Sequence, residues 1–526
     1  MTSQNTIIIG AGLDGLIAAY YLAKAGHKPL VLERREVIGG ACATEEFHPG
    51  FRTSLATSTG SLVPQIAADL QLQSRGVEIK RNPVRVTALN SGGPPVCIYE
   101  DAKRTAVELA PHSQRDSERY AGFLACFDNI GRALRPLLLM TPPNIDGPTK
   151  SELWNLGKLG WKIRGLGKQD EYRLLRYGPM AVADLAAEWF EHESLRAVVA
   201  ARGIFGAFAG PWSAGTSLPL LLQAATDGHA IAPATFVKGG LSVLVDAIAK
   251  AATEAGAEIR TGAQVTAIEV TDGQAVAVLL DGGESIPART IISNSDPGST
   301  LLGLIDAGEL PPSFRIKAQN YRAHGAVARI DLALSAMPSF AGIGDNEREQ
   351  LSGHLHIGSD IDYLERAFDA AKYGEISERP YLDIVMPTIN DPALAPGGAH
   401  VMSIHAQFAP YKLKHGDWDL RREELGETIV GALSEYAPDI SRLILARRIV
   451  TPLDLETKYG FRGGHIHHGE MSIDQFFAFR PVIGCAQYHT PIKGLYLCGA
   501  GTHPGGGLTG ASGLNASREA IKDLKR

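Results

Sequence analysis

A glycine-rich turn near the amino terminus constrains the fold of this 526-residue chain more than any other feature. Ile7–Ile9 reads as a buried strand, the turn Gly10-Ala11-Gly12-Leu13-Asp14-Gly15 follows at once, and helix-forming residues extend to Ala25. Gly10 permits a tight turn, Gly12 lets the backbone approach a pyrophosphate, and Gly15 lets the helix pack on the strand. The N-terminus of the helix would then offer unpaired N–H groups to the anion.

An acidic residue at a fitting distance strengthens this motif. A second buried strand is expected over 29–33, and it ends at Glu33, 18 residues beyond Gly15. A carboxylate at that position can accept hydrogen bonds from both hydroxyls of an adenosine ribose. The order strand, turn, helix and strand therefore predicts a Rossmann-type dinucleotide-binding unit at the start of the chain.

Three further glycine-rich stretches favour FAD over NAD as the dinucleotide. Gly39-Gly40-Ala41 follows the acid and can close a loop on the pyrophosphate. Near the carboxyl terminus, Gly494–Gly501 reads as a strand that runs into glycines, and Leu508–Gly513 leads into a helix. The N-terminus of that helix is suited to the electron-rich N1–C2=O edge of a flavin. The chain has no second G-x-G-x-x-G motif, so a separate NAD(P)H domain is not expected.

The charge balance and the cysteines argue against several classes of protein. Lys and Arg total 51 and Asp and Glu total 57, a net charge of −6, whereas proteins that hold nucleic acid are usually basic. The five cysteines stand singly, so neither a disulfide framework nor a zinc site is expected. The polar amino terminus leaves no room for a signal peptide. We therefore expect a cytoplasmic protein without a nucleic-acid partner.

The segment 154–168 (WNLGKLGWKIRGLGK) suggests peripheral contact with a membrane. It mixes large apolar residues with four basic ones, a composition that can lie on an anionic surface and admit a lipidic substrate. Its four glycines weaken it as a helix by up to about 1 kcal/mol each. A solvated segment of a substrate domain is the alternative.

Three blocks of the chain resemble the phytoene desaturase-like FAD-dependent oxidoreductases: Gly10 to Thr44, Lys238 to Pro297, and Gly464 to Asn515. Within that family the likeness is closest to the branch called pyridine nucleotide-disulfide oxidoreductase domain-containing protein 2. It covers essentially the whole chain. It implies an α/β fold with a Rossmann-type FAD-binding domain and a mixed sheet-and-helix substrate domain, as in flavin amine oxidases. We expect the FAD domain to be discontinuous, over residues 1–80, 231–310 and 465–526, and the substrate domain to take residues 81–230 and 311–464.

The resemblance also implies which residues surround FAD. They are Gly10, Gly12, Leu13, Asp14 and Gly15 at the pyrophosphate, Glu33 at the adenosine ribose, Arg34, Gly40 and Ala41 along the same groove, Val265 at the adenine, and Gly501, Gly510 and Ala511 by the flavin ring. One departure stands out, because this branch usually has His-Asn where Leu13 and Asp14 stand. An acid near a pyrophosphate is unfavourable unless its side chain turns away or is paired.

Few side chains suggest chemistry of their own. His503, in the glycine-rich stretch after Gly501, is the candidate proton carrier, and a loop histidine that holds the backbone by hydrogen bonds is the alternative. Residues 465–468 (HIHH) with Glu470 suggest a metal site, but adjacent histidines cannot all face one ion. No metal is therefore expected. Cys498 reads as a small apolar residue in a buried strand.

We expect an FAD-dependent oxidoreductase of the desaturase, dehydrogenase or saturase type. It would move a hydride between flavin N5 and a hydrophobic, unsaturated or isoprenoid-like small molecule, with oxygen, a quinone or a protein as electron acceptor. Three alternatives stay open: a redox-neutral double-bond isomerase, a non-catalytic FAD-binding interaction protein, and a flavin amine oxidase. The last needs aromatic side chains beside the flavin, and the local candidates are Phe477, Phe479 and Tyr496. The substrate, the direction of the reaction, the acceptor and the oligomeric state are left open.

Overall fold

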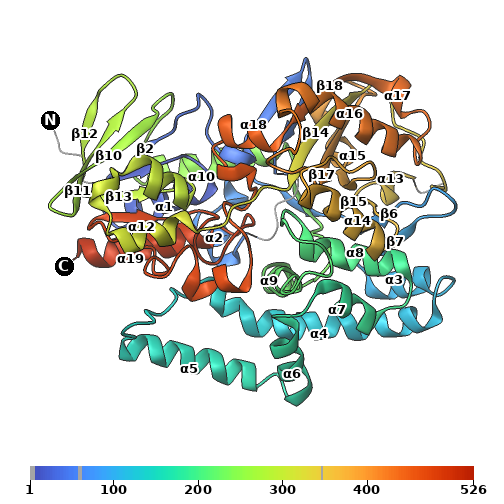
Figure 1. Cartoon of the computed structure of the whole chain (residues 1–526), viewed down its shortest axis with the longest axis horizontal. Helices are drawn as coiled ribbons and strands as arrows, with labels where there is room; N and C mark the ends of the chain where they lie inside the picture. Colours follow the sequence, from blue (N-terminus) through green and yellow to red (C-terminus); the bar gives the residue numbers. More distant parts are fainter. Residues whose placement is uncertain (1–5, 57–61, 345–346, 526) are drawn as a thin grey trace.

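The computed structural model describes residues 6–56, 62–344 and 347–525. Two large β-sheets stand side by side in it (Figure 1). A layer of helices runs beneath the two sheets in the same view. The expected α/β fold class is confirmed.

The first sheet has five strands, all parallel. In spatial order they are β19 (Leu495–Leu497), β13 (Thr290–Ser293), β1 (Thr6–Ile9), β2 (Leu30–Leu32) and β9 (Glu258–Arg260). The central strands are short runs of branched apolar residues and are buried, as parallel strands covered on both faces usually are. The helices packed with them are α1 (Leu13–Lys24), α10 (Leu241–Glu254) and α19 (Ala511–Leu524).

The strands of this sheet come from three distant parts of the chain, within the ranges 1–80, 231–310 and 465–526. The assignment of whole ranges to one domain or the other stays a prediction. Smaller sheets accompany the large ones. They are the meander β10 (Val265–Thr271), β11 (Gln274–Leu280) and β12 (Ser285–Pro287), the hairpin β3 (Thr44–His48) and β4 (Phe51–Ser54), and the pair β5 (Ile79–Arg81) and β8 (Thr235–Val237).

The second sheet is mixed and has seven strands. In spatial order they are β18 (Ile444–Val450), β14 (Val327–Leu334), β17 (His400–Gln407), β16 (Tyr381–Val385), β15 (His354–Ile357), β6 (Val84–Ala88) and β7 (Val96–Tyr99). Alternate residues of β14 to β17 form an apolar face that packs with α16 (Trp418–Ser434). The opposite face carries Arg329, Asp331, Asp383 and His405, which is unusual for buried strands.

Residues 113–230 are mostly helical, as expected. The helices of this layer are α3 (Ala102–Leu109), α4 (Gln114–Leu138), α5 (Lys150–Arg164), α6 (Lys168–Tyr177), α7 (Val182–Trp189), α8 (Glu193–Ile204) and α9 (Leu218–Asp227). α5 begins with a capping box between Thr149 and Glu152, and none of its residues is buried. Over the part of the chain that the structure describes, no helix is both long and apolar enough to cross a membrane.

Candidate active site

A groove of about 720 Å³ opens at the carboxyl ends of β1 and β2, where ligands bind in open parallel sheets. Nine of the residues predicted to bind FAD line it: Gly10, Gly12, Leu13, Asp14, Glu33, Arg34, Gly40, Ala41 and Val265. The other predicted residues, Gly15, Gly501, Gly510 and Ala511, are not among its lining residues. Lining residues that the sequence did not reveal include Asn294, Tyr459, Phe461, Ile466 and Leu508.

Close packing of backbone explains the glycines of the first turn. A Cβ on Gly12 would lie 2.7 Å from Nδ2 of Asn294, and a Cβ on Gly15 would lie 2.2 Å from the carbonyl oxygen of Gly10. The amide of Gly39 donates to the carbonyl of Ala11 at 2.8 Å, so the second glycine pair closes against the first turn. These contacts leave no room for side chains between α1, β1 and the groove.

Glu33 is held in place by the backbone around it. Its Oε2 accepts a hydrogen bond from the amide of Ala11 at 2.8 Å, and its Oε1 accepts one from the amide of Arg35 at 3.0 Å. Two amide donors fix the carboxylate at the end of β2, on the wall of the groove. The side chain of Arg34 is held by a separate contact, in which its Nη2 donates a hydrogen bond to the carbonyl of Lys458 at 2.8 Å.

Asp14 is paired, as the electrostatics of the site demand. Its Oδ1 accepts a hydrogen bond from the amide of Gly513 at 2.9 Å, which joins α1 to α19. Burial is the larger effect on this carboxyl and raises its pKa to about 6. A Cβ on Gly513 would lie 2.2 Å from the carbonyl oxygen of Asp14, so the two helices touch here backbone to backbone.

The predicted flavin-side residues shape the loop rather than face the groove. A Cβ on Gly501 would lie 2.3 Å from Cδ of Pro297. Gly510 has a φ of +70° at the N-cap of α19, and a Cβ there would lie 2.5 Å from Cδ1 of Ile17. Ala511 is the first residue of α19 and is fully buried. The loop between them sends Gly507 and Leu508 to the groove instead.

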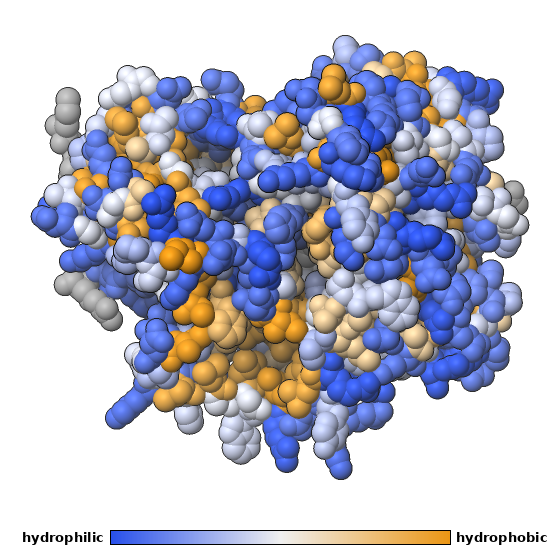
Figure 2. Space-filling model, in the orientation of Figure 1, coloured by the Kyte–Doolittle hydropathy of each residue, from blue (hydrophilic) through white to orange (hydrophobic). Residues whose placement is uncertain are grey.

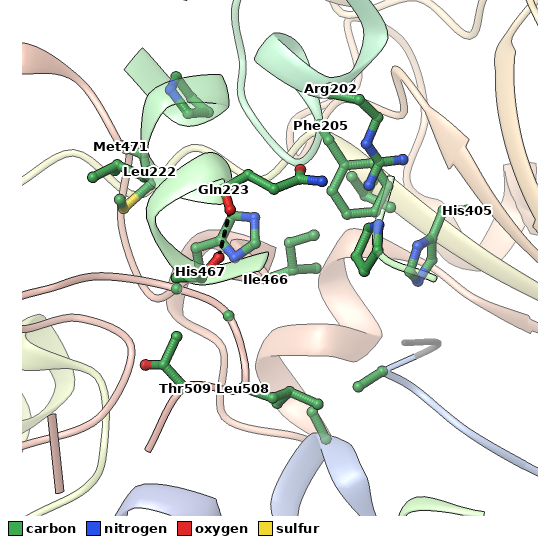
Figure 3. Close-up of a pocket in the computed structure, with 18 of the residues that line it drawn as sticks. Arg202, Phe205, Leu222, Gln223, His405, Ile466, His467, Met471, Leu508 and Thr509 are labelled. Carbon is green, nitrogen blue, oxygen red and sulfur yellow. Dashed lines mark hydrogen bonds between the residues drawn. The ribbon is translucent and has the colours of Figure 1, made fainter. Parts of the chain in front are cut away.

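A cavity of about 270 Å³ lies against this groove and shares five of its lining residues: Ala41, Phe461, Ile466, Gly507 and Leu508. We call it the central cavity. Most of its wall is apolar, with contributions from Leu55, Leu138, Phe205, Leu222, Val327, Leu455 and Met471. Figure 3 shows Phe205, Ile466 and Leu222 turned toward the same space from different elements. A ligand in this cavity would meet one in the groove at the shared residues.

Four basic side chains form one side of the central cavity, and we call this the polar end: Arg202, Arg329, His354 and His405. Each is less than one-tenth exposed. Arg202 Nη1 lies 3.4 Å from Oδ2 of Asp383, whose other oxygen lies 2.9 Å from Nδ1 of His354. Arg329 Nη1 donates to Nε2 of His405 at 3.0 Å, and burial together with this guanidinium lowers the pKa of His405 to about 3. His405 is therefore neutral.

Comparison with known proteins decides the family. Pyridine nucleotide-disulfide oxidoreductase domain-containing protein 2 from Rattus norvegicus is 34% identical over 99% of this chain and 94% of its own length. Phytoene desaturase (neurosporene-forming) from Rhodobacter capsulatus is 25% identical over 97% of this chain and 93% of its own length. The chain belongs to the phytoene desaturase-like FAD-dependent oxidoreductases.

Two family models and the solved structures agree with this assignment. The model described as flavin containing amine oxidoreductase matches residues 182–362, and the NAD(P)-binding Rossmann-like domain matches residues 8–64. Cyclohexylamine oxidase from Brevibacterium oxydans IH-35A superposes with a TM-score of 0.60 at 16% identity, covering 100% of both chains. This likeness shows a shared fold. The protein is thus an FAD-dependent oxidoreductase with a fold common to flavin amine oxidases.

The groove suits FAD in its own geometry. The turn at Gly12 leaves bare backbone before the N-terminus of α1, where a pyrophosphate binds. Glu33 presents an oriented carboxylate for ribose hydroxyls one strand away. Apolar lining follows toward the central cavity, as an isoalloxazine ring needs.

His503 is not among the residues that line the cofactor groove or the central cavity. Its ring is fully buried, and Nε2 lies 2.7 Å from the carbonyl oxygen of Leu137. The carbonyl can only accept, so Nε2 carries the proton, and burial lowers the pKa of the ring to about 4. This geometry fits the alternative interpretation, a neutral histidine that holds the backbone of α4.

The other local candidates also lie elsewhere. Phe477 packs on His503 with ring centroids 5.2 Å apart, Phe479 is 42% exposed, and the hydroxyl of Tyr496 donates to Asp523 at 2.8 Å. The aromatic residues that do line the cavity are Phe205 and Phe461. Phe205 stands in the apolar stretch 203–212, which the sequence allows either to line the cavity or to pack in the core, and Phe461 carries no signal of its own in the sequence.

The histidine-rich stretch 465–468 contributes two residues to the central cavity, Ile466 and one histidine. His467 lines it, while Glu470 accepts a hydrogen bond from Nε of Arg322 at 2.8 Å and lies beside His324. Cys498 is fully buried, and its Sγ lies 3.5 Å from Oδ1 of Asn294. Among the described residues no cluster of three or more histidine, cysteine or acidic side chains could hold a metal ion.

Proposed function

We propose that this protein moves a hydride between FAD and a hydrophobic, unsaturated or isoprenoid-like small molecule held in the central cavity. The observation that carries the proposal is the contact between the two spaces: the mainly apolar cavity meets the cofactor groove at Phe461, Ile466 and Leu508. When bound, FAD supplies an acceptor or donor of hydride. A dry, shaped cavity beside it is what the protein must add.

Several residues of the chain have defined tasks in this proposal. Phe205, Phe461 and Leu222 enclose the carbon skeleton and keep water out. His467 is the imidazole on the far side of the cavity from Arg202 in Figure 3. Burial holds the pKa of His467 at about 4, so the ring is neutral and can accept the proton that accompanies hydride removal. A glutamine at this position removes that acceptor.

An anaerobic visible spectrum of the purified protein tests the proposal. Polyenes, enals and amines are added in turn, and the oxidised flavin band is followed. Bleaching by polyenes or enals supports hydride transfer from an unsaturated substrate, and re-oxidation by oxygen, a quinone or a carrier protein then identifies the acceptor. Bleaching by amines alone supports the second candidate, amine oxidation, which the matched family model favours. The proposal is wrong if none of these compounds bleaches the oxidised flavin and none of them is reduced by flavin that has been photoreduced.

We propose further that α5 contacts an anionic membrane surface. Trp161 and Trp154 are 82% and 67% exposed, and Lys158 and Lys162 lie on the same helix. Figure 2 shows hydrophobic surface just above the place where Figure 1 draws α5. Exposed tryptophans beside lysines are the combination that binds the interface of an anionic bilayer. This contact would bring the protein to a hydrophobic substrate dissolved in lipid.

A further inference from the structure

A second and smaller space, of about 80 Å³, adjoins the polar end of the central cavity, and we call it the side chamber. The hairpin β3–β4, the strand β8 and the ends of β15 and β16 contribute to its wall. Seven of its lining residues carry hydroxyl or amide groups: Thr44, Thr53, Ser54, Asn82, Thr235, Ser352 and Asn390. About 10–15 Å³ is enough for one water molecule where polar groups can bond it, so the chamber has room for several.

The side chamber and the central cavity share three lining residues, Ala56, Pro233 and His354. Ala56 and Pro233 have no titratable side chain. Among the described residues that border both spaces, His354 is therefore the one that can carry a proton from one to the other. Thr44 and Asn390 in the wall of the chamber are partly exposed, so water can reach it from outside.

Asp383 on the neighbouring strand β16 fixes which nitrogen of His354 is free. Its Oδ1 and Oδ2 lie 2.9 and 3.1 Å from Nδ1 of the ring. Burial alone would raise the pKa of Asp383, but the charges of His354 and Arg202 outweigh it and hold that pKa well below its usual range, so the carboxylate is ionised. An ionised carboxylate only accepts, so Nδ1 carries the hydrogen and Nε2 keeps the lone pair that can take up a second proton.

The other two histidines of the central cavity cannot keep a proton at neutral pH. Burial and the guanidinium of Arg480 lower the pKa of His467 to about 4. Burial and the guanidinium of Arg329 lower the pKa of His405 to about 3. A proton that His467 accepts must therefore move on to another group. His354 differs from both because its hydrogen-bond partner is a carboxylate, which stabilises a positively charged ring.

Resting on the proposed function, we infer that His354 carries the proton of the reaction between the central cavity and water in the side chamber. In desaturation, one C–H bond of the substrate gives a hydride to FAD, and the electron pair of the neighbouring C–H bond forms the double bond. The proton left by that second bond, first accepted by His467, passes to Nε2 of His354 and then to water. Saturation uses the same route in reverse. The route joins the chemistry to solvent while the apolar wall keeps bulk water out of the central cavity.

Deuterium exchange at Cε1 of the histidine rings tests the route without depending on turnover. This exchange needs water at the ring, and mass spectrometry of fragmented peptides resolves it for single residues. In the FAD-bound protein we expect His354, which is only 4% exposed, to exchange within about tenfold of the rate of the exposed His415. His503 is fully buried and lines neither space, so it should stay protected and is the control. Slower exchange of His354 than this overturns the inference.

Substitutions then test the transfer itself, with the substrate that bleaches the flavin. His354→Gln and His354→Ala should each slow flavin reduction about 100-fold, and added imidazole should restore at least about tenfold of the rate in His354→Ala alone, because only alanine leaves space for it. His356→Gln is the control on the same strand. His356 lines neither space, and its Nε2 lies 2.7 Å from the carbonyl oxygen of Gly358, a contact that a glutamine amide can replace. We expect this control to stay within about threefold of the wild-type rate.

The two proposals fail in different ways. If a compound reduces the flavin and the His354 variants react as fast as the wild-type protein, the proposed function stands and the inference is wrong. A slow His354→Ala variant that imidazole does not rescue also contradicts the inference, because a structural defect would behave in this way. If no compound exchanges electrons with the flavin, the proposed function and the proton route are both wrong. Should neither variant fold, the exchange at Cε1 of His354 in the wild-type protein decides.

Discussion

The carboxyl of Asp14 offers the sharpest test of how the cofactor groove is built. Its pKa is raised from 3.8 to about 6 because the side chain, which lines the groove, is partly withdrawn from solvent at the junction of α1 and α19. A raised pKa in the folded state means that the folded protein binds the proton more tightly than the unfolded chain. Its cost to stability is therefore absent below about pH 4, grows between about pH 4 and 6, and is constant above.

We predict that Asp14→Asn raises the free energy of unfolding by roughly 3 kcal/mol above pH 7 and by about half of that at pH 5. The asparagine oxygen can still accept the hydrogen bond from the amide of Gly513, so the helix junction is kept. Asp14→Ala removes the charge and also that acceptor, and it should gain less. The assay is urea-induced unfolding of the flavin-free protein over this pH range.

The same variant should bind FAD more tightly, because a carboxylate in the groove opposes the pyrophosphate. We expect the affinity of the wild-type protein for FAD to rise as the pH falls from 7.5 to 5.5, and that of Asp14→Asn to change much less. Flavin fluorescence during titration measures both. Equal stability of the two proteins at pH 8, or a difference that does not shrink toward pH 4, would refute the reasoning.

Three further predictions follow from other parts of the structure. Gly15→Ala should destabilise the protein by about 1–3 kcal/mol and lower its flavin content, because the added Cβ would lie 2.2 Å from the carbonyl oxygen of Gly10. Gly160→Ala in the exposed helix α5 is the control and should leave the stability unchanged or raise it. Thermal melting measures both effects on stability. His503→Gln should lower the melting temperature and leave the rate of flavin reduction within about threefold; a loss of about 100-fold or more would restore its role as proton carrier. Replacing Trp154 and Trp161 with Ser should abolish co-sedimentation with anionic vesicles without changing binding of FAD, and retained co-sedimentation would contradict contact through α5.

The cofactor half of the site was predictable because it depends on local geometry. The turn from Gly10 to Gly15 and the acid at Glu33 stand within one β-α-β unit, so their spacing along the chain fixes their spacing in space. The structure accordingly brings Gly12 and Glu33 to one groove. Residues on other elements of the same groove, such as Asn294 and Phe461, carry no comparable signal, because their positions depend on pairing between distant strands and on long loops.

His503 shows the limit of motif reasoning. Its place after Gly501 correctly puts it in the loop before α19, but a motif does not tell which way a loop side chain points. The ring turns to the carbonyl of Leu137, 366 residues earlier in the chain. Such a partner is set by the packing of α4 against the C-terminal region, which no local pattern describes.

The polar end is a product of strand register. Arg329 lies opposite His405, His405 lies opposite Asp383, and Asp383 lies opposite His356, so one row across four strands carries only charged or titratable residues. The faint signal in the sequence is the alternation in 325–332 (GAVARIDL), where Arg329 and Asp331 stand two apart among apolar residues.

A slip of one residue in these strands would turn Ile330 and Ile404 to the cavity and bury the charges against α16. The cost of burying unpaired charges in that apolar layer excludes the slipped register. The same residues that give the central cavity its polar wall therefore also hold its sheet in register, which ties the lining of the site to the stability of the fold.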